Sequence, residues 1–216
     1  MSPTAAVFKP GALITKSWDV FKDNLGPLLG GFVIMVAILS ASGVVYFGPL
    51  ILGGPFALGY YKMVRDAIAG RRVEMGDLFY GFHHFLPAFL AYLLISIFSI
   101  IGTLFCIIPG ILVGIVYAPV YLFILDGEND FWQAMESSRK MVMDNFMQWL
   151  LLMVVLFLLN LGGLLLCCVG ILVTGPMSTV IIALAYDQEL GLAAINTLAT
   201  PVDSAMDAPQ DPPFEG

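Results

Sequence analysis

The sequence predicts an all-α polytopic membrane protein. We expect six transmembrane helices, arranged as three repeated hairpins that are each preceded by an amphipathic interfacial helix. Of the 216 residues, 59% are hydrophobic and only 12% are charged, unlike a soluble domain. Three stretches contain no Asp, Glu, Lys or Arg: Asn24–Tyr61, Leu78–Leu125 and Asn145–Tyr186, of 38, 48 and 42 residues. A helix needs about 20 apolar residues to cross a bilayer, so each stretch is long enough to cross twice.

The expected spans differ in length. They are Leu25–Val45, Pro49–Tyr61, Leu86–Phe105, Gly110–Leu125, Phe146–Leu166 and Gly170–Tyr186. A helix of about 16 residues rises only about 24 Å, against a hydrocarbon core of about 30 Å. Either the helix ends extend into the turns, or some hairpins enter the membrane without crossing it. Both alternatives leave all charges on one side.

The distribution of cationic residues predicts the orientation. All nine lie before or between the charge-free stretches: Lys9, Lys16, Lys22, Lys62, Arg65, Arg71, Arg72, Arg139 and Lys140. Because Lys and Arg in short loops favour the cytoplasmic side, we expect both termini and both long connections in the cytoplasm.

The charge-free stretches belong to a threefold internal repeat. Moving the sequence by 121 residues places Asp66 on Asp187, and moving it by 60 places Asp66 on Asp126. The larger shift also places Asn24 on Asn145. Each unit then contains an amphipathic segment, a span, a Gly/Pro turn, a second span and an acid. We expect one membrane domain, 1–190, with repeats at about 9–66, 72–127 and 130–188, then a C-terminal segment, 191–216, that is a disordered, acidic, Pro-rich tail from about 201.

The segment before each hairpin has the apolar spacing of an amphipathic helix. In the first unit, Trp18 and Phe21 share a face, and Asp19 and Lys22 lie elsewhere on the helix. Such helices lie along the membrane interface, although ordinary packing of membrane-proximal helices would produce the same pattern. The candidates for lipid contact are Trp18, Phe21, Phe82, Phe85, Phe131 and Trp132.

Each second span contains a proline: Pro55, Pro119 or Pro176. A proline inside a helix removes a backbone hydrogen bond and kinks the helix. Broken helices surround the substrate sites of many transporters, but most kinks only serve packing. We favour the packing role.

Two polar clusters resemble metal sites, but their spacing favours other roles. His83 and His84 are adjacent, so on a helix they point in different directions, whereas helical metal sites use i, i+3 or i, i+4 spacing. The run Asp126–Asp130 lacks the Gly at position six and the Glu at position twelve of a calcium loop. We interpret the histidines as polar residues near headgroups. The acidic run is then a turn, after which Asp130 starts the next helix. We predict no metal site.

The cysteines and the lack of motifs limit the chemistry further. A disulfide between Cys106 and either Cys167 or Cys168 is one alternative; the other is that all three are small apolar residues. No charged residue lies inside an expected span, and no nucleotide-binding or hydrolase motif occurs. We therefore predict no catalytic residue, no cofactor and no enzyme activity. No basic patch is large enough for nucleic acid.

Three motifs indicate a family. The turn IGTLFCIIPGILV at Ile101–Val113, AMESSR at Ala134–Arg139 and the A-x-A-Y pattern at Ala183–Tyr186 resemble a family of bacterial integral membrane proteins. That family is similar to the membrane domain attached to some bacterial glycerophosphodiester phosphodiesterases. The resemblance covers about 15–190 and implies the fold and the bacterial cytoplasmic (inner) membrane. It carries no catalytic motif, so we do not infer phosphodiesterase activity.

These observations predict a non-enzymatic integral membrane protein that organises lipid or a partner protein. Its partners would be membrane lipids, with a second copy of the chain or another membrane protein as further possibilities. The alternative is a transporter or channel for an apolar or lipid-like solute. A filled centre between the hairpins would favour the first function, and a continuous lined cavity would favour the second.

Overall fold

The chain is described by a computed structural model over residues 10–43, 48–105, 107–128, 130–165 and 169–199, and within these ranges it is helical apart from short turns. The prediction of an all-α fold is therefore confirmed. The elements are α1 Pro10–Asp23, α2 Leu25–Ser42, α3 Gly48–Ile68, the 3-10 helix η1 Met75–His84, α4 Phe85–Phe105, α5 Ile107–Val116, α6 Val120–Leu125, α7 Phe131–Asp144, α8 Phe146–Leu165 and α9 Val169–Ala199.

Four segments within the described ranges are long and apolar enough to cross a membrane: Leu25–Ser42, Met75–Leu104, Phe146–Leu165 and Gly170–Gly191. The second combines η1 with α4, which follows it directly. The two other expected spans, Pro49–Tyr61 and Gly110–Leu125, are not among them. Pro49–Tyr61 belongs to α3, which also carries Lys62, Arg65 and Asp66 in its last turns. Gly110–Leu125 is apolar but shorter than the four candidate spans.

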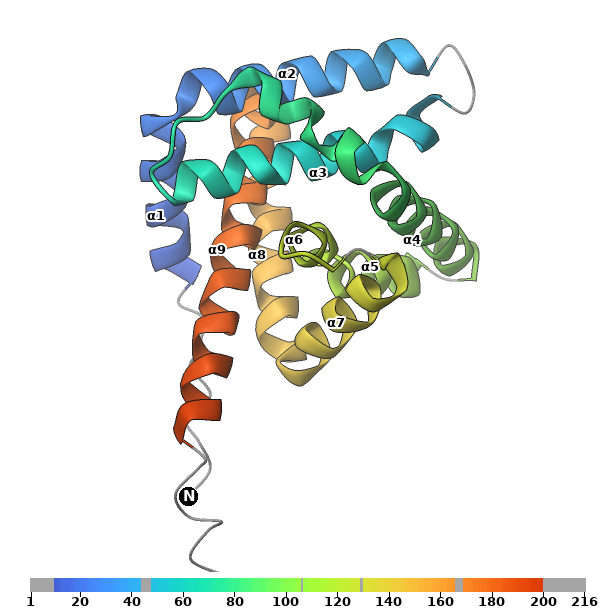
Figure 1. Cartoon of the computed structure of the whole chain (residues 1–216), viewed down its shortest axis with the longest axis vertical. Helices are drawn as coiled ribbons and strands as arrows, with labels where there is room; N and C mark the ends of the chain where they lie inside the picture. Colours follow the sequence, from blue (N-terminus) through green and yellow to red (C-terminus); the bar gives the residue numbers. More distant parts are fainter. Residues whose placement is uncertain (1–9, 44–47, 106, 129, 166–168, 200–216) are drawn as a thin grey trace, which may run out of the picture.

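Helices that follow one another pack in pairs: α2 contacts α3, α4 contacts α5, and α8 contacts α9. In Figure 1, α2 and α3 run across the direction of α8 and α9. The last helix, α9, contacts α1, α2 and α3 as well as α8. Large apolar side chains from several pairs fill the space between them. Leu28, Leu122, Trp149, Ile181 and Tyr186 are all at most 1% exposed.

The same backbone turn separates an amphipathic helix from an apolar helix at two places. Asn24 lies between α1 and α2 with φ −120° and ψ 29°. Asn145 lies between α7 and α8 with φ −125° and ψ 39°. These residues are the pair that the 121-residue shift aligns. Both are non-helical, so each lets the chain change direction without a long loop.

Glycines let the backbones of η1 and α3 come into direct contact. A Cβ atom on Gly59 would overlap the carbonyl oxygen of Leu78, and one on Gly81 would overlap the carbonyl oxygen of Pro55. Phe56 of α3 then lies edge-on to Phe82 of η1, with 5.3 Å between ring centroids. These contacts agree with the role of small residues in close helix packing.

The three candidate kink prolines differ in effect. Pro55 and Pro176 are buried inside α3 and α9, and both helices continue past them. Pro119 instead stands at a break, because α5 ends at Val116 and α6 begins at Val120.

Neighbouring helices satisfy the carbonyls that this break releases. Ser138 of α7 donates its hydroxyl to the carbonyl of Val116 at 2.7 Å. Tyr61 of α3 donates to the carbonyl of Ala118 at 3.4 Å. The break at Pro119 is thus a packed junction between parts of all three expected repeats.

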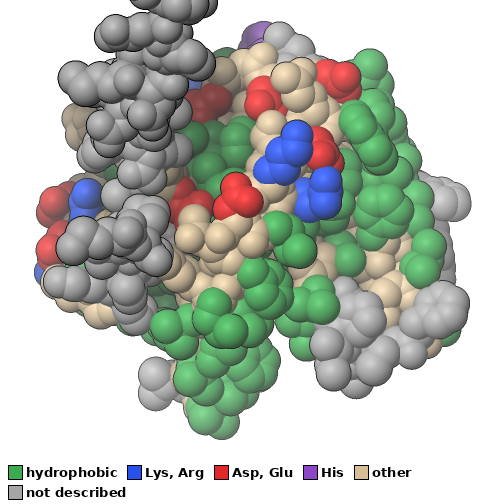
Figure 2. All heavy atoms as spheres, turned by 90° about the horizontal axis from the view of Figure 1, so that it is seen from below, with side chains coloured by type: hydrophobic (Ala, Val, Ile, Leu, Met, Phe, Trp, Pro, Cys, Tyr) green, Lys and Arg blue, Asp and Glu red, His purple; other side chains and the backbone are tan. Residues whose placement is uncertain are grey.

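Apolar side chains are exposed along the outer faces of the long helices. Ile100 and Leu104 of α4 are 68% and 83% exposed, and Phe157 and Leu165 of α8 are 66% and 78% exposed. In Figure 2, projecting lobes are covered by hydrophobic side chains, and Lys, Arg, Asp and Glu side chains gather between them. This surface is the reverse of that of a water-soluble protein, where large apolar patches are rare.

Candidate functional site

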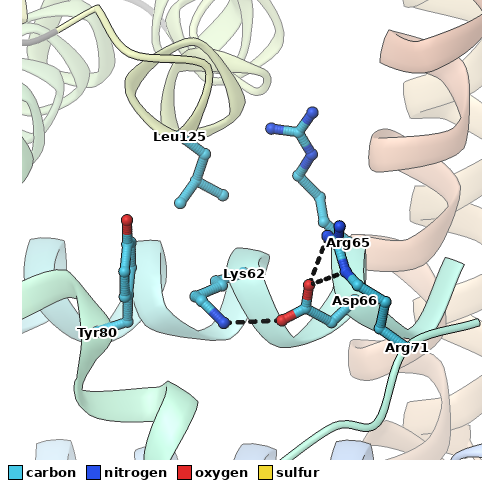
Figure 3. A pocket seen from close by; sticks show the side chains of 6 residues that line it. All are labelled: Lys62, Arg65, Asp66, Arg71, Tyr80 and Leu125. Carbon is cyan, nitrogen blue, oxygen red and sulfur yellow. Dashed lines mark hydrogen bonds and ion pairs between the residues drawn. The ribbon is translucent and has the colours of Figure 1, made fainter. Parts of the chain in front are cut away.

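Side chains from three parts of the chain meet around a pocket of about 150 Å³. In Figure 3, Lys62, Arg65 and Asp66 come from α3, Tyr80 of η1 stands at one side, and Leu125 of α6 covers the pocket. The lining residues are Lys62, Arg65, Asp66, Arg71, Tyr80 and Leu125. We call these residues, with their partners Asp77, Asp126 and Tyr186, the polar cluster.

Asp66 is at the centre of the polar cluster and is only 7% exposed. One carboxylate oxygen accepts a hydrogen bond from Lys62 Nζ at 2.8 Å, and the other accepts from Arg71 Nε at 2.8 Å. Burial raises the pKa of the Asp66 carboxyl, but the hydrogen bonds and charges of Lys62 and Arg71 outweigh burial and hold this pKa below its usual range.

Lys62 joins α3 to η1. Its Nζ also donates to Asp77 at 2.8 Å and lies 5.2 Å from the centroid of the Tyr80 ring. Burial lowers the pKa of Lys62, but Asp66 and Asp77 together raise it above its usual value. The ammonium therefore stays charged and is held from three sides.

Arg65 and Asp126 connect the first and second expected repeats, and Tyr186 adds the third. Arg65 Nη1 donates to one Asp126 oxygen at 2.5 Å, and the Tyr186 hydroxyl donates to the other at 2.5 Å. Asp187, the next residue of α9, interacts electrostatically with Arg65 and Asp126. The acids that the repeat aligns, Asp66, Asp126 and Asp187, therefore all belong to or border this one cluster.

The charge balance shows what the polar cluster can do. Its three cations face the three paired acids Asp66, Asp77 and Asp126. Such a balanced set offers little net attraction to a charged ligand, and its side chains are occupied by one another. Its chemistry is that of a connector, which holds the C-terminal ends of α3 and α6 against η1 and the middle of α9.

The histidine pair and the acidic run have separate local roles. His84 Nε2 lies 3.4 Å from the Tyr80 hydroxyl, and His83 is exposed. Asp130 caps α7 by accepting from the Trp132 N–H at 3.0 Å, which confirms the helix start, while Glu128 accepts from Ser137 at 2.9 Å. In the part of the chain that the structure describes, no group of three His, Cys, Asp or Glu side chains could hold a metal ion.

The candidates for lipid contact fall into three groups. Trp18, Phe82 and Trp132 are 43%, 39% and 59% exposed. Phe85 and Phe131 are half-buried.

Phe21 lies in the core and is 1% exposed, so this side chain does not contact lipid. Ser17 and Leu13, one and two turns before it, are buried on the same side of α1. The reason is that α1 packs against α9. The apolar face of α1 therefore contacts protein rather than lipid, and Trp18 lies at the edge of that face.

A second polar network lies within the α8–α9 pair. The Asn160 side chain donates to the Ser178 hydroxyl at 2.7 Å and accepts from the Thr174 hydroxyl at 3.0 Å. Near the C-terminal end of α8, Gly170 of α9 lies so close that a Cβ atom on it would overlap the backbone of Gly163. Hydrogen bonds and close backbone contact therefore join the two helices in a largely apolar setting. Cys106, Cys167, Cys168 and the tail 201–216 lie outside the described residues.

The fold and these sites define a class: an all-helical protein whose described residues include four helical segments long and apolar enough to cross a membrane. Comparison with known proteins finds no family model, no curated protein and no solved structure that matches this chain.

Proposed function

We propose that the protein is a non-enzymatic integral membrane protein that organises lipid or a partner protein in the bacterial cytoplasmic membrane. The observation that carries this function is a filled core inside an apolar outer surface. Trp149 and Ile181 fill the space between the helix pairs, whereas Leu104 and Leu165 point outwards. An exposed side chain of that size costs about 2 kcal/mol in water, so the outer surface requires lipid or protein around it.

The proposal includes the finer topology: three repeated hairpins, six spans and both termini in the cytoplasm. The matching turns at Asn24 and Asn145 support the repeat. The polar cluster supports a single charged side, because it gathers the ends of three second spans. The family similar to the membrane domain of glycerophosphodiester phosphodiesterases remains our proposal for the origin of the fold.

The rival function is transport of an apolar or lipid-like solute, and one observation favours it. The α5–α6 helix is broken at Pro119, as helices often are at transporter sites. However, the released carbonyls of Val116 and Ala118 bond to Ser138 and Tyr61. These atoms are therefore engaged in packing and are not presented to a solute, which supports the organising function.

Reconstitution into vesicles tests the two functions together. We expect the chain to restrict the motion of neighbouring spin-labelled lipids without speeding the exchange of a fluorescent lipid between leaflets. Protein-free vesicles, and vesicles holding a single-span peptide at equal mass, give the baselines. Exchange that rises with protein content would support the transporter. If lipid motion is unrestricted at every protein-to-lipid ratio, the protein does not organise lipid. The remaining form of the proposal is then that it organises a partner protein.

A further inference from the structure

A groove of about 240 Å³ lies between α5 and α7, apart from the polar cluster. Its lining is Leu112, Val113, Val116, Tyr117, Arg139 and Met143. Four of these side chains are aliphatic or thioether groups, and Tyr117 and Arg139 provide a hydroxyl and a guanidinium. The groove is smaller than the 300–1,000 Å³ typical of pockets that enclose a drug-sized ligand. It suits part of one hydrocarbon chain with a polar group attached.

The break at Pro119 gives the groove its shape. The Ser138 hydroxyl bonds to the Val116 carbonyl and fixes α7 against the end of α5. Arg139 is the next residue of α7, so its side chain is positioned beside that junction. The Tyr117 ring lies 6.5 Å from the Phe98 ring of α4, which supports it from the other side.

The charge at the groove is net positive. Arg139 donates to Glu136 through Nε at 3.0 Å and Nη2 at 2.8 Å, and Lys140 Nζ lies 3.5 Å from the same carboxylate. Two cations therefore share one acid. A guanidinium has five N–H donors, so Glu136 leaves three of them for another acceptor. Because this ion pair is exposed, it contributes little stability by itself.

We propose that this groove binds an anionic phospholipid, with one acyl chain along Leu112, Val113, Val116 and Met143 and the phosphate at Arg139 and Tyr117. The inference rests on the proposed function and specifies its lipid. An apolar wall that leads to a cation and a hydroxyl matches an acyl chain that leads to a phosphate. Arginine is well suited to the phosphate because it donates two parallel hydrogen bonds.

The test is lipid retention by the purified full-length chain, measured by native mass spectrometry. The two probes are phosphatidylglycerol and phosphatidylcholine with identical acyl chains. We expect phosphatidylglycerol to be retained about tenfold better. Both lipids offer a phosphate, but only phosphatidylcholine brings a quaternary ammonium, which the net positive charge at Arg139 disfavours. Arg139→Gln should remove this preference.

Lys140→Gln is the matched control, since it removes the same charge from the adjacent position outside the groove lining. We expect it to keep most of the preference. Equal losses in the two variants would show attraction to a diffuse charge and would overturn the site.

A second pair of variants tests the apolar wall. Val113→Phe should fill the groove and lower the retention of both lipids, whereas Ile111→Phe, on an exposed face of α5, should not. If Val113→Phe retains both lipids as the parent chain does, the groove is not the site. Circular dichroism establishes that each variant is folded.

Photolabelling keeps the site testable if a variant does not fold. A phosphatidylglycerol with a diazirine in its acyl chain should label peptides of α5 and α7 in the unmodified chain. Soluble glycerol phosphate should not compete. Competition by glycerol phosphate, or labelling confined to other helices, would overturn the proposal. Restricted lipid in vesicles without dependence on Arg139 would refute this site alone, whereas unrestricted lipid would contradict the lipid-organising function on which the site rests.

Discussion

Arg65 of α3 is paired with Asp126, which follows α6, across 61 residues of sequence. Both side chains are about one-third exposed, at 28% and 32%. The same carboxylate accepts the Tyr186 hydroxyl from α9. One acid thus joins three expected repeats, and removing it should loosen their relative positions.

Asp126→Asn should destabilise the protein by about 1–2 kcal/mol, because charge-assisted hydrogen bonds from Arg65 and Tyr186 are weakened. The measurement is the melting temperature in detergent. A double-mutant cycle with Arg65→Gln should show coupling between the two residues. Lys22→Gln, which breaks an exposed pair with Asp19, should change the melting temperature little. Additive losses at Arg65 and Asp126 would show that the pair does not couple the repeats.

Asp66 should make the stability depend on pH in the acid range. Its folded pKa is lowered by Lys62 and Arg71 in spite of burial, and its unfolded pKa is about 4. The carboxylate therefore contributes stability that is fully present above about pH 4 and is lost as pH falls through the folded pKa.

The measurement is unfolding in detergent as a function of pH, with the parent chain compared with Asp66→Asn. The variant should be less stable at neutral pH, and the difference should shrink as pH falls below about 4. Asp19→Asn, an exposed control, should run parallel to the parent. A constant difference across this range would mean that Asp66 titrates alike in the folded and unfolded states.

Ser138→Ala should destabilise the junction at Pro119. It leaves the Val116 carbonyl without the hydroxyl that bonds to it, and an unsatisfied buried polar group costs about 1–3 kcal/mol. Thermal unfolding measures the loss, and Ser40→Ala, at an exposed position of α2, is the control. Equal stability of the two variants would show that the break does not need α7.

The sequence predicts the bounds of two apolar helices well because their ends are local features. The expected spans Leu25–Val45 and Phe146–Leu166 correspond to α2 at Leu25–Ser42 and α8 at Phe146–Leu165. In both cases the apolar helix begins directly after an Asp-Asn pair. Asp130 likewise indicated the start of α7 correctly, because a cap depends on neighbouring residues.

Contacts between distant residues were not predictable in the same way. The shifts aligned Asp66, Asp126 and Asp187 but did not indicate that they meet at one cluster. Phe21 shows a second limit: helical periodicity identifies an apolar face, but not whether lipid or protein covers it. At Pro119 the sequence predicted a kink, while the partners that satisfy the break lie 22 residues after Val116 and 57 residues before Ala118.

Cysteine labelling should reveal the orientation. After replacement of the native cysteines, Arg72→Cys and Lys140→Cys should resist an impermeant maleimide in intact cells and react after permeabilisation, because the charge bias predicts a cytoplasmic position for both. Labelling of either in intact cells would reverse the orientation.

Gly43→Cys, at the end of α2, is the complementary position. If the first hairpin crosses the membrane, this cysteine should react from outside. If it stays unreactive while both cytoplasmic positions behave as expected, the hairpin enters the membrane without crossing.

Trp18 should report whether α1 lies at the membrane interface. It is 43% exposed beside the buried Phe21, and Lys22 Nζ lies 5.7 Å from its ring centroid. With Trp132 and Trp149 replaced by Phe, its fluorescence should be quenched more by lipids brominated near the headgroup than by lipids brominated near the chain end, because indole rings favour the interface. The control keeps only Trp149, which is 0% exposed and should be quenched weakly by both lipids. If Trp18 behaves like Trp149, a partner or another part of the protein covers α1, and this helix has no part in organising lipid.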